Sequence, residues 1–317
     1  MDAKSLKLLK ELMGIASPSG FEVNIQKVVT RHLKQYCGEV RTDVHGNTIG
    51  ILNPKAPLRV MLAGHCDEIG LMVTHIDDKG YVYVAAVGGI DPNVMNAQRV
   101  RFFTAKGVVQ GVIGRKPIHL LEREERERAL KIHDLWIDIG AKDRKDAGKC
   151  LSIGDYGTID AGFIELRNGF VAARGFDDRA GAFVMLETMR RLFSKKCRVA
   201  VFGVSTVQEE VGLRGARTSA FGINPHVGIA IDVGFASDAP GIDPKIVGDS
   251  KLGKGPILHR GPNINPVLGR MLETSARKRR IPFQVTAEPR ATGTDANVMQ
   301  VNREGSAAAL ISVPNRY

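Results

Sequence analysis

The chain has 317 residues, of which 43% are hydrophobic and 25% charged, so it can bury a large core. Its formal net charge of +11 suggests a nucleic-acid partner, but Lys and Arg are spread along the chain and mixed with acidic residues. Aromatic residues make up only 6%, too few for a surface that stacks bases. We therefore expect no nucleic-acid binding.

Two further features concern the cellular compartment. No apolar run reaches the length of a membrane span, and residues 4–13 predict an amphipathic helix without the apolar core of a signal peptide. The four cysteines form neither a CxxC pair nor a zinc-finger spacing. We expect a cytoplasmic protein with reduced thiols and no membrane partner.

The first 68 residues have an α/β pattern. The predicted elements are helices at 6–13 and 22–34 around the loop 17–20, a hairpin or strand pair at 39–52, and a buried strand at 58–63. That strand leads into Gly64-His65-Cys66-Asp67-Glu68. Strand alternation would direct His65 and Asp67 to one side and Cys66 into the packing.

The His-x-Asp spacing admits two interpretations. A carboxylate two residues from a histidine can accept its second ring N–H and fix the tautomer that binds metal. A lone histidine at a strand end is more often structural. A metal ligand and a structural histidine therefore stay open as alternatives for His65.

Residues 69–161 have a different character. Short β-like runs are separated by turns and interrupted by a charged, helix-like stretch at 121–131. This spacing predicts a small all-β, barrel-like domain inserted into the main fold. Its histidines have no metal-ligand spacing, so we expect it to serve as a partner interface or a lid.

The α/β pattern resumes at about residue 162, which predicts a discontinuous catalytic domain of residues 1–68 and 162–317. Asp177 and Asp178 open a predicted helix that runs to Leu192, where a helix cap is the usual role of an aspartate. A buried strand at 199–204 leads to Glu209 and Glu210. We expect an α/β/α arrangement around a mixed sheet.

A further buried strand, at 226–231, delivers Asp232. With it, one histidine and four carboxylates stand at separate strand or helix ends: His65, Asp177, Glu209, Glu210 and Asp232. Converging carboxylates repel each other unless a cation compensates, and mixed His and carboxylate ligands suit zinc, cobalt or manganese. Two metals sharing an aspartate would leave one glutamate free as a base for amide or ester hydrolysis.

Four segments, GHCDEIG, GFDDRAG, VSTVQEEVGLRGA and IDVG, resemble in order and spacing the TET-type dinuclear metallo-aminopeptidases. That family includes deblocking and glutamyl aminopeptidases and proteins once labelled cellulase M or endoglucanase. The resemblance covers essentially the whole chain. It implies an aminopeptidase acting on peptides with two divalent ions per chain, zinc or cobalt, and a dimerisation role for residues 69–161 within a tetrahedral dodecamer.

The resemblance also implies roles for the individual residues. His65 and Asp232 would hold one metal, Glu210 would belong to the other, and Asp177 would bridge them. Glu209 would be the general base and Asp67 would orient His65. The sequence does not identify the S1 pocket, although residues 253–259 and 292–295 are candidates for its walls.

One departure from the family concerns the C-terminus. In the family, a histidine that completes the second metal site follows a Pro-Arg-Tyr-like stretch, and a helix comes after it. The sequence here stops at Tyr317. The resemblance therefore implies either a truncated sequence or an incomplete second site in an assembled but catalytically impaired homologue. A deacylase or an endoglucanase on the same fold are further alternatives.

Overall fold

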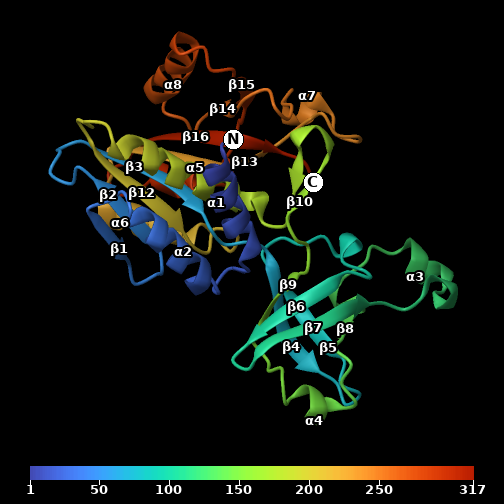
Figure 1. Cartoon of the computed structure of the whole chain (residues 1–317). Coiled ribbons are helices and arrows are strands. Elements are labelled where there is room, and N and C mark those ends of the chain that lie inside the picture. The colour runs from blue at the N-terminus through green and yellow to red at the C-terminus, as the bar shows by residue number, and fades with distance from the viewer. The chain divides into compact units, whose positions relative to one another are not determined.

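The computed structural model describes residues 1–317 and divides into two compact units (Figure 1). One unit contains residues 1–67 and 175–317, and the other contains residues 68–174. The range expected from the sequence for the inserted domain is 69–161, and these bounds stay a prediction. Residues 162–174, which include the two-stranded hairpin β10–β11, fall within the second unit.

The larger unit is built on an eight-stranded mixed sheet with the order β1-β2-β12-β3-β13-β16-β14-β15. Strands β12, β3, β13 and β16 run parallel to one another, whereas β1–β2, β2–β12 and β14–β16 pair in antiparallel fashion. The strands are β1 (Glu39–Thr42), β2 (Thr48–Leu52), β3 (Arg59–His65), β12 (Ala200–Thr206), β13 (Val227–Phe235), β14 (Ile257–Arg260), β15 (Gln284–Ala287) and β16 (Ala307–Asn315).

Helices cover both faces of this sheet, which confirms the predicted α/β/α arrangement. One apolar cluster joins the sheet to α1, α2 and α5, and the other joins it to α6, α8 and α9. The helices are α1 (Ala3–Gly14), α2 (Val23–Leu33), α5 (Phe176–Phe193), α6 (Arg214–Ile223), α7 (Pro244–Val247), α8 (Pro266–Lys278) and α9 (Ala296–Gln300).

Strand alternation explains why both faces are apolar. On β3, Met61 and Ala63 face the cluster with α6, α8 and α9, while Leu62 between them faces the cluster with α1, α2 and α5. A strand buried on both faces has a continuous apolar run in its sequence, as parallel strands between two helix layers do. This is why residues 58–63 were predictable as a buried strand.

The smaller unit contains a closed six-stranded antiparallel barrel with the order β4-β5-β8-β7-β6-β9, as predicted. Its strands are β4 (Gly70–Ile76), β5 (Val82–Val87), β6 (Arg99–Thr104), β7 (Gly107–Gly114), β8 (Trp136–Asp138) and β9 (Tyr156–Ile159). A separate apolar core that includes Leu71, Phe102 and Ile137 fills it. The hairpin strands β10 (Ile164–Glu165) and β11 (Val171–Ala172) and the helix α4 (Arg144–Ala147) also belong to this unit.

The helix expected at residues 121–131 is much shorter in the structure. Only α3 (Arg123–Glu127) is helical, and none of its residues is buried. A helix this short without an apolar face has little tertiary packing to stabilise it, which explains why it does not extend further. No helix in the chain is long and apolar enough to cross a membrane.

Candidate metal and catalytic site

The candidate site lies at the ends of three neighbouring parallel strands. His65 is the last residue of β3 and pairs in register with Thr206, the last residue of β12. Asp232 lies in β13, on the other side of β3, and Glu209 follows β12 by three residues. Because parallel strands end at the same edge of a sheet, side chains far apart in sequence meet there.

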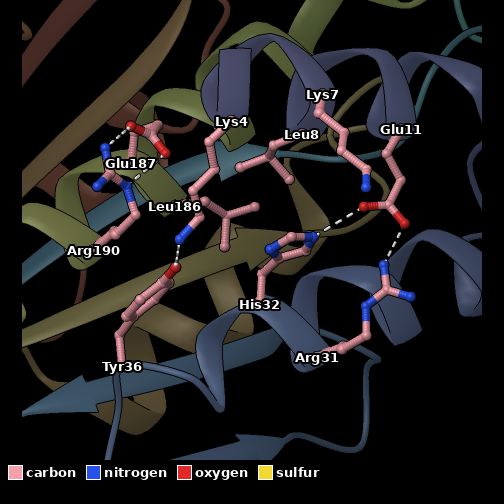
Figure 2. A pocket seen from close by; sticks show the side chains of 10 residues that line it. All are labelled: Lys4, Lys7, Leu8, Glu11, Arg31, His32, Tyr36, Leu186, Glu187 and Arg190. Atoms are coloured by element: carbon pink, nitrogen blue, oxygen red, sulfur yellow. Dashed lines mark hydrogen bonds and ion pairs between the residues drawn. The ribbon is translucent and has the colours of Figure 1, made fainter. Parts of the chain in front are cut away.

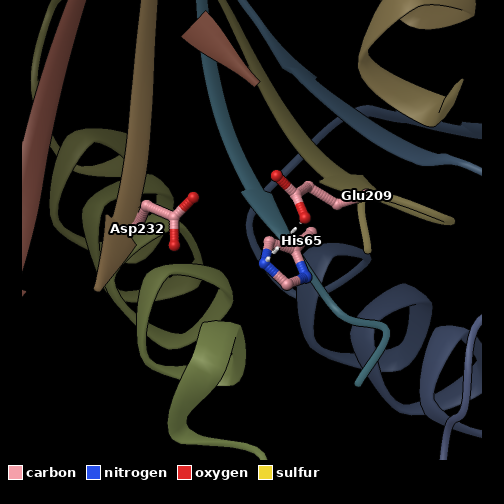
Figure 3. A group of neighbouring side chains, drawn as sticks. All are labelled: His65, Glu209 and Asp232. Atoms are coloured by element: carbon pink, nitrogen blue, oxygen red, sulfur yellow. Dashed lines mark ion pairs between the residues drawn. The ribbon is translucent and has the colours of Figure 1, made fainter. Parts of the chain in front are cut away.

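His65, Glu209 and Asp232 form the inner group of the site, and Figure 3 shows their side chains gathered at these strand ends. One potential ligand atom from each lies within 4.8 Å of the others. All three residues are buried, with exposed fractions of 2%, 8% and 6%. Two carboxylates and an imidazole are thus held together with little access to water.

A second group shares the same histidine. Ligand atoms of His65, Asp177 and Glu210 also lie within 4.8 Å of one another. His65 Nε2 is 3.2 Å from Asp177 Oδ1, and the Asp177 side chain is 55% exposed. The structure therefore brings together all five predicted residues, with the Asp177 side on the solvent side of the group.

Asp67 lies behind the imidazole. His65 Nδ1 is 3.2 Å from the Asp67 carbonyl oxygen and 3.4 Å from its carboxylate Oδ1. The backbone carbonyl is thus the nearer partner of the ring, where the sequence suggested the carboxylate. Cys66, between these two residues, is fully buried in the cluster with α1, α2 and α5, as its predicted packing role requires.

Burial and mutual repulsion govern the acidity of the carboxyl groups. Burial, followed by nearby carboxylates, raises the pKa of Glu209 to about 9 and those of Glu210 and Asp232 to about 7, although His65 opposes these shifts. The anionic forms of these groups are therefore unfavourable unless a cation is close. Such an arrangement fits a divalent metal ion.

For His65 and Asp67, by contrast, the charged form is favoured. Burial would lower the pKa of His65, but hydrogen bonding with Asp177 and Asp67 raises it well above its usual value. Burial would raise the pKa of Asp67, but His65, Ser19 and the Glu209 backbone hold it below its usual value. Asp67 therefore stays ionised more readily than Glu209, Glu210 or Asp232.

Two buried acids near the group received no individual role from the sequence. Asp178 is fully buried and accepts the backbone N–H groups of His65 and Gly181, at 3.3 and 2.9 Å. Asp295 accepts the Thr206 hydroxyl at 2.7 Å, and burial raises its pKa to about 6. Asp178 was visible only as one of a pair at a helix start, and Asp295 only within the glycine- and threonine-rich stretch 291–295.

A cavity of about 390 Å³ lies elsewhere, between α1, α2 and α5 (Figure 2). Its charged side chains largely pair with one another. Lys4 donates to the Tyr36 hydroxyl at 3.3 Å, and Arg190 donates to Glu187 at 2.7 Å. None of its lining residues belongs to the His65 group, so we place the candidate site at the strand ends.

Comparison of the amino-acid sequence with known proteins identifies the family of this chain. Residues 46–317 match the family described as M42 glutamyl aminopeptidase. A lysyl aminopeptidase of Pyrococcus furiosus is 44% identical over 315 residues, which cover 98% of this chain and 89% of that protein. The chain belongs to the M42 family.

Solved structures of TET aminopeptidases share the whole M42 fold seen here. A TET aminopeptidase from a marine-sediment Thaumarchaeota archaeon is 35% identical with a TM-score of 0.94, and the match covers 100% of this chain and 90% of that one. The Pyrococcus horikoshii TET1 peptidase, described as assembling into a tetrahedron or a large octahedral shell, is 32% identical with a TM-score of 0.88. That match covers 99% of this chain and 92% of TET1.

Proposed function

We propose that this M42 protein is a metal-dependent aminopeptidase that removes N-terminal residues from peptides by a two-metal mechanism. The observation that carries the proposal is the gathering of four carboxylates around His65 in two neighbouring ligand groups. Relatives named lysyl aminopeptidase and TET aminopeptidase support the substrate class.

The donor set suits divalent cations, and among these residues the second ion would have Glu210 and the shared Asp177 as ligands. Four carboxylates and one imidazole gather in the two groups, and the ion pairs within them all involve His65. We assign His65 and Asp232 to one ion, Glu210 to the other, and Asp177 to a position between them. The mixture of nitrogen and oxygen ligands favours zinc or cobalt over calcium.

Glu209 is the residue we assign as general base. Its carboxylate is 3.8 Å from His65 Nε2, so it reaches the centre of the group. Burial raises its pKa above that of an exposed glutamate, so its carboxylate takes up a proton more readily. Asp67, buried behind the imidazole, keeps His65 in one orientation.

These assignments define what each residue does during hydrolysis. When bound, the ions would polarise the peptide carbonyl and make a water molecule more acidic. Glu209 takes the proton from the attacking water and delivers it to the leaving amine as the peptide bond breaks.

We further propose that the chain self-associates through the barrel of residues 68–174, predicted as 69–161, and builds a dodecamer. The assembly described for the TET1 peptidase supports this. Mass photometry on the full chain tests it. A particle of about twelve chains is expected, and a monomer at all concentrations would contradict it.

Hydrolysis of a panel of aminoacyl-p-nitroanilides by the metal-loaded chain tests the activity. We expect turnover that a chelator abolishes and added zinc or cobalt restores. N-acylated amino acids and a β-glucan belong in the same panel. Turnover of either one without aminopeptidase activity would favour a deacylase or an endoglucanase, and metal binding without any turnover would favour an impaired homologue.

A further inference from the structure

The segment that carries Glu209 and Glu210 has an unusual set of hydrogen bonds. Immediately after β12, four consecutive backbone N–H groups donate to side-chain oxygens and not to a neighbouring strand. The pairs are Val207 to Asn47 Oδ1 at 3.1 Å, Gln208 to Glu22 Oε1 at 3.1 Å, Glu209 to Asp67 Oδ1 at 3.1 Å, and Glu210 to Asp67 Oδ2 at 3.2 Å. The position of this segment therefore depends on three side chains from elsewhere in the fold.

All three acceptor side chains are buried. Asn47 and Asp67 have exposed fractions of 0%, and Glu22 has 6%. They belong to separate segments. Asn47 lies in the turn between β1 and β2, Glu22 directly before α2, and Asp67 just after β3. Buried acceptors form stronger and better-defined hydrogen bonds than exposed ones, because water does not compete for them.

The loop between α1 and α2 supports these acceptors in turn. The Ser19 hydroxyl donates to Asp67 Oδ2 at 2.6 Å, the same oxygen that accepts the Glu210 N–H. Glu22 Oε1 accepts the Gly20 N–H at 2.8 Å as well as that of Gln208. Ser19 has an exposed fraction of only 4%.

The backbone conformation shows why such support is needed. Gln208 has φ 54°, in the left-handed region that side chains other than glycine adopt rarely. It directly precedes Glu209. A residue in this conformation persists only when its surroundings determine it, and Glu22 supplies the hydrogen bond at this position.

We propose that Ser19 and Glu22 are positioning residues that hold the Glu209–Glu210 segment in place through Asp67 and Gln208. The catalytic consequence rests on the proposed function, because Glu209 is assigned there as base and Glu210 as a metal ligand. Residues behind a metal site commonly change affinity or activity by about 10–100-fold when removed. We expect an effect of that size.

Hydrogen exchange tests the positioning without relying on activity. Exchange of the backbone amides of residues 207–210 is measured on the full chain, with and without zinc, for Ser19→Ala and for the matched control Ser5→Ala. The Ser5 hydroxyl is also buried and donates to a carboxylate, Glu187 Oε2 at 3.1 Å, but in α1. We expect exchange about tenfold faster in Ser19→Ala and unchanged in Ser5→Ala. Equal exchange in both would overturn the proposal.

Kinetics of Glu22 variants provide the second test. Glu22→Gln keeps an oxygen acceptor of the same length, whereas Glu22→Ala removes it. With an aminoacyl-p-nitroanilide substrate we expect kcat to fall about 10–100-fold in Glu22→Ala, with KM nearly unchanged, and to recover in Glu22→Gln. An equal loss in both variants would show that the hydrogen bond to Gln208 is not responsible, and the proposal for Glu22 would fail.

The two proposals can fail separately. A wild-type chain without aminopeptidase activity would refute the proposed function, while the exchange experiment would still decide the role of Ser19. An active wild-type chain whose 207–210 amides exchange at the same rate in Ser19→Ala would refute only the positioning role. Thermal unfolding of each variant identifies any that is unfolded.

Discussion

Gly64 and Gly181 lie in direct backbone contact. A Cβ atom built on Gly64 would be 2.5 Å from the carbonyl carbon of Gly181, a distance that real Cβ atoms do not show. The absence of a side chain at Gly64 lets β3 pack closely against α5. This contact sets the distance between His65, the next residue on β3, and Asp177 in the first turn of α5, whose side chains come within 3.2 Å.

Substitution of Gly64 by alanine tests this contact. The added methyl group meets backbone and not a flexible side chain, so β3 and α5 must separate. We expect the free energy of unfolding to fall by about 1–3 kcal/mol. Gly38→Ala is the control, because nothing lies within 4 Å of its Cβ position. Denaturant unfolding of both variants measures the difference, and similar stabilities would argue against a close contact.

Glu209→Gln separates base catalysis from metal binding. The amide cannot accept a proton from water, whereas its size and its backbone hydrogen bond to Asp67 are retained. We expect kcat to fall by about 10²–10⁴-fold with nearly full metal content. Steady-state kinetics and elemental analysis of the same samples measure the two quantities. A large loss of metal would indicate that Glu209 is a ligand in the group with His65 and Asp232.

Asp177→Ala addresses the proposed position between two ions. Its carboxylate is the most exposed member of the group and contacts the ring of His65. Removing a ligand shared by two ions weakens both sites, so we expect metal content per chain to fall after dialysis against metal-free buffer. Asp178→Asn, one residue later, leaves the Asp177 oxygens in place and serves as comparison. Full metal retention in Asp177→Ala would refute the shared position.

The buried ring of His259 should make the stability of the chain depend on pH, in addition to any effect of the candidate metal group. Its ring is buried between Ser312 Oγ, at 2.9 Å, and Thr286 Oγ1, at 3.1 Å, and burial lowers its pKa to about 4. An unfolded histidine has a pKa of about 6.5, so the unfolded chain binds more protons between these values. The neutral His259 ring therefore contributes roughly 3 kcal/mol to the free energy of unfolding. This contribution is fully present above pH ~6.5 and is lost as the pH falls towards about 4.

Denaturant unfolding at several pH values checks this expectation. The wild type should lose more stability than His259→Gln between pH ~7 and ~5, because glutamine does not titrate. Because the carboxylates around His65 are present in both proteins, their effect on stability cancels when the wild type is compared with His259→Gln. Parallel pH profiles would mean that the His259 ring is protonated with little penalty in the folded chain.

The sequence predicted the layers of the fold, and the gathering of the candidate site residues at one edge of the sheet, for one physical reason. Buried parallel strands such as β3 and β12 have continuous apolar runs, and polar residues directly after such runs meet at one edge of the sheet. His65, Glu209 and Asp232 follow this rule. The short β-like runs of the inserted unit likewise predicted a barrel.

The supporting residues could not be predicted in this way. Glu22 is 186 positions from Gln208 and Ser19 is 48 from Asp67, and no local pattern links either pair. Glu22 looks like an ordinary residue at a helix start, and Ser19 like part of a polar loop. Their roles follow only from the packing of α1 and α2 against the sheet. A third long-range pairing, between Glu68 and Arg174, is equally invisible to any local pattern.

That pairing joins the two ends of the inserted unit. Glu68 and Arg174 are its first and last residues, both largely buried, and the Arg174 guanidinium donates to Glu68 Oε2 at 2.6 Å. Once the barrel has formed, its entry and exit points are held side by side. Bringing β3 and α5 together then costs only the entropy of closing a short connection. Without the folded barrel, the same contact would close a loop of more than a hundred residues, which costs more. Early folding of the barrel would therefore speed assembly of the sheet.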